Sequence, residues 1–85
     1  MSAPDRRCLL VVPDLGLGPI PLAVSVWLVP EGGSVRTGDR VVELVAGGAT
    51  VDLEAPVSGR LLRHRADEDD VVAPGHVLAE FEGLP

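Results

Sequence analysis

Apolar and polar residues alternate along most of the chain with a period of two. Val24, Val26 and Leu28 occupy every second position of one segment, while Ala23, Ser25 and Trp27 lie between them. Because successive side chains of a strand point to opposite faces, this period indicates strands with one buried face. Bounded by Pro, Gly and acidic clusters, the pattern predicts strands over Leu9–Val12, Ala23–Val29, Arg40–Val45, Thr50–Glu54, Gly59–Arg65 and Val77–Phe81.

The pattern does not support helices. It shows no long run with a period of 3.6, and prolines at 13, 19, 21, 30, 56 and 74 interrupt most candidate segments. We therefore expect an all-β fold, a flattened barrel or sandwich of two small antiparallel sheets. The residues that we expect to face its core are Val24, Val26, Leu28, Val42, Leu44, Val51, Leu53, Ala79 and Phe81.

A weak internal repeat appears when the chain is shifted by 37 residues. The shift brings Glu31 onto Glu68 and Gly38 onto Gly75, and it also aligns Pro19 with Pro56, Val35 with Val72 and Glu43 with Glu80. One such half is too small to bury its apolar face alone. The repeat therefore predicts two similar strand sets related by a quasi-twofold axis.

The centre of the chain predicts a β-hairpin. Two alternating segments flank Ala46-Gly47-Gly48-Ala49, and Gly-Gly supplies the positive φ values of a primed hairpin turn. We expect the tip of the hairpin to lie at the opposite end of the domain from the C-terminus.

The length of 85 residues suits a single domain with a modest core. We expect residues 1–8 to be a flexible N-terminal segment, 9–82 the domain and 83–85 a tail. The net charge of −6, without a basic stripe, argues against nucleic-acid binding. No apolar segment approaches the ~20 residues that span a bilayer, so we expect no membrane association and a cytoplasmic location.

The composition also limits the chemistry of the chain. All seven basic residues are arginine, so the sequence contains no lysine. Cys8, the single cysteine, has no partner for an internal disulfide, and we expect it to be a small apolar strand residue.

Several segments together resemble the lipoyl/biotinyl attachment domains of 2-oxo acid dehydrogenase acyltransferases and biotin carboxylases. The resemblance extends from Val11 to Glu82. It rests on the order and spacing of Val12–Gly16, Trp27–Gly32, Val35–Asp39, Val41–Leu44, Ala49–Asp52, Ala55–Gly59 and Leu78–Glu80, with Val72 and Gly75. It implies two antiparallel sheets related by a quasi-twofold axis, with a cofactor lysine exposed at a hairpin tip.

The tip departs from that family's pattern. The family usually has an acidic residue, a small residue, then Asp, Lys and Ala, whereas this chain has Val45, Ala46, Gly47, Gly48 and Ala49. Gly48 therefore stands at the attachment position that the resemblance implies. Because lipoate and biotin are joined to a side-chain amine, we predict that the chain binds neither cofactor.

Other candidate residues do not form a site in the sequence. His64 and His76 occur singly, without a second ligand at metal spacing, so we expect no metal site. The cluster Asp67–Asp70 lacks the glycine and spaced oxygen ligands of a calcium loop. None of Ser25, Ser34 and Ser58 lies in a nucleophile elbow. We therefore predict no catalytic residue and no small-molecule ligand.

These observations favour a lipoyl-like module without cofactor attachment, acting through protein contacts. Its expected partner is an enzyme of an acyl-transfer, 2-oxo acid dehydrogenase or carboxylase-type assembly, docked at the hairpin end. Two alternatives stay open: an acyl-carrier subunit that uses Cys8 or a serine, and a structural lipoyl-like adaptor domain.

Overall fold

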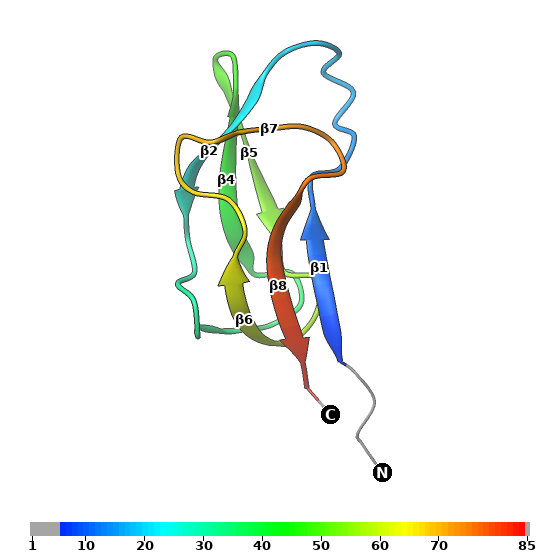
Figure 1. Cartoon of the computed structure of the whole chain (residues 1–85), viewed down its shortest axis with the longest axis vertical. Helices are drawn as coiled ribbons and strands as arrows, with labels where there is room; N and C mark the ends of the chain where they lie inside the picture. Colours follow the sequence, from blue (N-terminus) through cyan, green and yellow to red (C-terminus); the bar gives the residue numbers. More distant parts are fainter. Residues whose placement is uncertain (1–5, 85) are drawn as a thin grey trace.

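The computed structural model describes residues 6–84, which form eight strands and no helix. The strands are β1 (Arg7–Val11), β2 (Leu22–Trp27), β3 (Ser34–Val35), β4 (Arg40–Ala46), β5 (Ala49–Glu54), β6 (Gly59–His64), β7 (Val71–Val72) and β8 (Val77–Gly83). They make two four-stranded antiparallel sheets, in the orders β1-β8-β6-β3 and β5-β4-β2-β7 (Figure 1). The expected all-β sandwich is confirmed.

The strand limits differ from the predicted ones by up to two residues. β1 begins at Arg7 and β8 ends at Gly83, one or two residues beyond the expected limits of 9–82. Residues 1–5 and 85, which belong to the predicted flexible segment and tail, lie outside the described residues. The sequence pattern does not predict β3 and β7, because a strand of two residues is too short to show an alternation.

The core lies between the sheets, and β4 and β8 contribute more residues to it than any other strand. Phe81, Leu44, Leu61 and Leu78 are its largest fully buried side chains. Of the residues predicted to face inward, two are only half-buried, Val26 and Val51, and those that are buried are Val24, Val42, Leu44, Leu53, Ala79 and Phe81.

One predicted core residue is wrong: Leu28 is 46% exposed. A β-bulge between Val24 and Val26 shifts the register of β2 against β4. A bulge adds one residue to a strand and so exchanges the faces of the residues that follow. Trp27, predicted to face outward, instead packs against the core.

The 37-residue repeat appears in the structure as two halves that exchange hydrogen bonds. Gly32 N donates to Leu61 O over 2.7 Å, and Asp69 N donates to Val24 O over 2.7 Å. Asp69 lies 37 residues after Gly32, and Leu61 lies 37 residues after Val24. The turn of each half is thus held by a strand of the other half, and the quasi-twofold arrangement is confirmed.

Trp27 and His64, equivalent positions of the two halves, stack on each other. Their ring centroids are 3.9 Å apart and their planes are inclined by 12°. Trp27 Nε1 donates to Ala66 O over 2.9 Å, and His64 Nε2 donates to Val29 O over 2.9 Å. Each ring therefore forms a hydrogen bond with the backbone of the opposite half.

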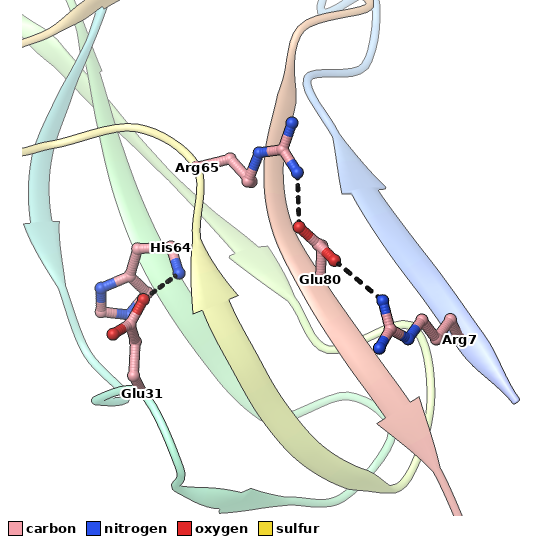
Figure 2. Close-up of polar contacts among 5 residues, drawn as sticks. All are labelled: Arg7, Glu31, His64, Arg65 and Glu80. Atoms are coloured by element: carbon pink, nitrogen blue, oxygen red, sulfur yellow. Dashed lines mark hydrogen bonds and ion pairs between the residues drawn. The ribbon is translucent and has the colours of Figure 1, made fainter.

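Two carboxylates complete the exchange at these positions. Glu68 accepts a hydrogen bond from Trp27 N over 3.1 Å, and Glu31 accepts one from His64 N over 2.8 Å (Figure 2). Glu31 and Glu68 are themselves 37 residues apart. Their recurrence in the repeat follows from their shared role of accepting a backbone N–H.

Glu80 of β8 lies on the outer face of the β1-β8-β6-β3 sheet, where it forms ion pairs with residues of neighbouring segments. Arg65 and Arg7 approach its carboxylate from the neighbouring elements, with N–O distances of 2.5 and 3.7 Å (Figure 2). Only 13% of the Glu80 side chain is exposed. The hydrogen bond from Arg65 lowers the pKa of this carboxyl against the opposing effect of burial, and the charges of Arg65, Arg63 and Arg7 lower it further.

We predict that Glu80→Gln lowers the melting temperature at neutral pH. Because its pKa is lowered on folding, ionised Glu80 stabilises the protein above the ordinary value of 4.5, and this contribution is lost as pH falls through the folded-state value. The difference in melting temperature between the variant and the wild type should become smaller as pH falls through the folded-state pKa of Glu80. Thermal denaturation at a series of pH values measures this difference. Glu82→Gln, on the same strand and without an ion pair among the described residues, is the control. A difference that stays constant through the acidic range would contradict this role.

We predict that His64→Ala destabilises the domain by about 1–3 kcal/mol, because it leaves the Val29 carbonyl unpaired and removes the ring stacked on Trp27. Denaturant unfolding followed by Trp27 fluorescence measures this loss. His76→Ala removes a histidine from an exposed turn and should cost about 1 kcal/mol or less. Equal losses in the two variants would show that the stack contributes nothing.

Candidate functional site

The hairpin formed by β4 and β5 is the candidate site. The strands pair from Arg40↔Glu54 to Ala46↔Ala49, which leaves Gly47 and Gly48 as a two-residue turn. In Figure 1 this turn lies at the opposite end of the molecule from the start of β1 and the end of β8. The expected hairpin is therefore present, and its tip is distant from both ends of the domain.

The turn differs in one respect from the predicted conformation. Gly47 has a φ of 60°, but Gly48 is not among the glycines with positive φ. A positive φ at the first turn position alone corresponds to a type II′ turn, which also suits the twist of a hairpin. Position 47 thus favours glycine, whereas position 48 accepts other residues.

Position 48 is open to solvent. A Cβ added at Gly48 would meet no atom within 4 Å. A side chain there would project from the tip without displacing any part of the fold. Residues 45–50 are Val, Ala, Gly, Gly, Ala and Thr, so the tip has no side-chain amine, thiol or carboxylate.

An apolar groove adjoins the hairpin end. It has a volume of about 330 Å³ and lies between the 14–22 segment and residues 71–74. Leu22, which lines the groove, pairs with Ala46 at the end of β4. Ile20 and Val71 are exposed apolar residues of its lining. The sequence pattern does not predict this groove, because its two walls are about 50 residues apart in the chain and are brought together by long-range pairing, that of β2 with β7 and that of Val12 with Gly75 and His76.

The two histidines have separate structural contacts. His64 belongs to the stack with Trp27 described above. His76 Nδ1 accepts a hydrogen bond from Ala73 N over 3.2 Å, as Asp39 Oδ2 does from Arg36 N over 2.9 Å. His76 therefore closes a turn that Asp39 closes in the first half. Within the described residues no group of three His, Cys, Asp or Glu side chains could hold a metal ion.

The acidic cluster forms a turn held by its own groups. Asp67 N donates to Asp70 Oδ2 over 2.8 Å, and Asp70 N donates to Asp67 O over 3.1 Å. The carboxylate of Glu68, also in the cluster, accepts the Trp27 N–H. The cluster thus shapes one of the two exchanged turns.

The candidate nucleophiles are scattered. Cys8 is half-buried in β1 opposite Phe81, at the far end from the hairpin tip. Ser58 Oγ accepts a hydrogen bond from Thr37 N over 2.9 Å, whereas Ser25 lies in β2 and Ser34 in β3. Ser34 and Ser58 line the same surface pocket, whereas Cys8 in β1 and Ser25 in β2 are not part of its lining. The part of the chain described here also lacks a helix that could cross a membrane.

Comparison with known proteins gives concordant results. The sequence profile of the family described as "Biotin-requiring enzyme" matches residues 10–81. The dihydrolipoyllysine-residue acetyltransferase component of the acetoin cleaving system of Pseudomonas putida is 34% identical over 70 residues, which cover 82% of this chain and 19% of that protein. The lipoamide acyltransferase component of the branched-chain alpha-keto acid dehydrogenase complex of Pseudomonas aeruginosa is 32% identical over 71 residues, covering 84% of this chain and 17% of that protein.

A solved structure supports the same fold. A single-chain, multi-domain long-chain acyl-CoA carboxylase superposes with a TM-score of 0.77 at 22% identity, covering all of this chain and 8% of the carboxylase. The chain thus spans less than a fifth of the curated relatives and less than a tenth of the carboxylase. The profile match extends over most of its length, and we conclude that the chain belongs to the biotinyl/lipoyl attachment domain family.

Proposed function

We propose that this chain is a lipoyl-like domain without an attached cofactor, which acts as a non-catalytic protein-interaction module. The observation that carries the proposal is the absence of lysine from the sequence, combined with glycine at the hairpin turn. In this family the attachment lysine stands at such a tip, and we assign Gly48 to that position from the resemblance in sequence and its place in the turn.

The chemistry of attachment supports the proposal. Lipoate and biotin are held by an amide to a side-chain amine, which glycine does not have. The seven arginines do not substitute for it, because a guanidinium remains protonated at neutral pH and is not an amine nucleophile. No other position of the chain supplies a side-chain amine.

The hairpin end has features that suit docking. The glycine turn allows close approach of a partner backbone, and the neighbouring groove exposes Ile20 and Val71. The relatives are components of an acetoin cleaving system and of a branched-chain alpha-keto acid dehydrogenase complex, and the structural neighbour is a carboxylase. We therefore propose as partner an enzyme of an acyl-transfer or carboxylase-type assembly, in the cytoplasm.

The position of Cys8 argues against the acyl-carrier alternative. An acyl group on this thiol would start from a half-buried strand residue opposite Phe81, far from the hairpin tip. No observation in the described residues favours the adaptor alternative.

We predict that the wild-type chain, co-expressed with active lipoate and biotin ligases, has the mass of the unmodified polypeptide. Gly48→Lys should acquire a covalent lipoyl or biotinyl group, because a side chain at this position meets no obstacle and φ is not positive. Its free energy of unfolding should stay within about 0.5 kcal/mol of wild type, as for other exposed substitutions. Intact-mass spectrometry with peptide mapping measures the modification.

Gly48→Arg is the matched control, since it adds a long cationic side chain without an amine. It should fold and remain unmodified. A cofactor-sized adduct on a side chain of the wild type would overturn the proposal. A Gly48→Lys chain that folds but is never modified would show that Gly48 is not the attachment position.

A further inference from the structure

The outer face of the β1-β8-β6-β3 sheet carries arginines on both sides of an acidic strand. The strand register sets Arg7 and Arg60 on either side of Glu82. It also sets Leu9 and Arg63 on either side of Glu80. The inward side chains of these strands, such as Phe81 and Leu61, are buried, so the charged residues lie on the outer face of the sheet.

This face differs in charge from the rest of the molecule. Its four arginines, Arg7, Arg60, Arg63 and Arg65, outnumber its two glutamates and leave a net charge of +2, although the whole chain carries −6. The paired strands β4 and β5 of the other sheet carry Glu43, Asp52 and Glu54 against Arg40. The two sheets are therefore oppositely charged.

The arginines of the face are not equally engaged. Arg65 and Arg7 form ion pairs with Glu80. Arg60 and Arg63 are exposed, and neither guanidinium forms a hydrogen bond or an ion pair with another described residue. Their guanidinium N–H groups can donate to carboxylates in the bidentate geometry that arginine favours.

Apolar side chains of β1 lie on the same face, across β8 from Arg60 and Arg63. Leu9 is 51% exposed and Val11 is 42% exposed, and both alternate in β1 with residues that pack on the core. Arginine is enriched at protein interfaces, and exposed apolar side chains that lie together mark interaction sites. Glu80 and Glu82, in the middle of the face, would repel a continuous polyanion.

We propose that this face docks an acidic segment of a partner protein, with carboxylates on Arg60 and Arg63 and an apolar side chain on Leu9 and Val11. The surface is separate from the hairpin tip and does not depend on the absence of a cofactor. A negative result for one surface does not contradict the proposal for the other, so the two proposals are tested independently.

The test uses the full chain labelled with ¹⁵N and a synthetic peptide of alternating glutamate and leucine, with a lysine-for-glutamate peptide as the reversed-charge probe. We expect the acidic peptide to shift backbone resonances of Leu9, Arg60 and Arg63, and to bind more weakly as salt is added. The proposal would be overturned if only hairpin residues changed their chemical shifts, or if both peptides bound with the same affinity.

Arg60→Gln combined with Arg63→Gln should weaken binding of the acidic peptide about tenfold, because each exposed charge pair contributes modestly. Arg36→Gln combined with Arg40→Gln removes the same charge elsewhere and should leave affinity within about twofold. Thermal unfolding of both variants checks that they fold. The proposal would be overturned if both double variants lost the same affinity for the acidic peptide. It would also be overturned if the chain bound phosphatidylserine vesicles but not the peptide, or if this face instead bound the acidic sheet of a second copy.

Discussion

The exchange of hydrogen bonds between the two halves is the interaction on which this fold depends. The turn that begins at Pro30 is held by β6, and the turn that begins at Asp67 is held by β2. At the contact of the halves, the Trp27 and His64 rings stack and each donates to the opposite backbone. Neither half can complete its core alone, so the two sheets form together.

This arrangement separates the fold from the hairpin tip. The exchanged contacts lie along the body of the sandwich, whereas the Gly47-Gly48 turn projects beyond it and position 48 meets no other atom. A change at the tip therefore has little effect on the core. The chain can retain the architecture of an attachment domain while its tip lacks the amine that attachment requires.

The same separation applies to the two faces of the sandwich. Successive side chains of a strand point alternately to the core and to the outer face of the sheet. The outer faces of the two sheets can therefore differ in charge without altering the packing of the core. The Arg65 contact with Glu80 shows that part of the outer face also stabilises the sheet. Arg60 and Arg63 lie beside this contact without an ion-pair partner among the described residues.

The sequence alone determined the all-β class, the six longer strands, the repeat and the glycine hairpin, because alternation and turn residues are local properties. It also contains no lysine, which is the basis of the proposal that no cofactor is attached. Only the tertiary structure decided that Leu28 is exposed and Trp27 packs inward, since a bulge depends on how β2 pairs with β4. The groove beside the tip and the arginine face were likewise beyond sequence reasoning, because strand register, set by long-range packing, brings distant residues to one surface.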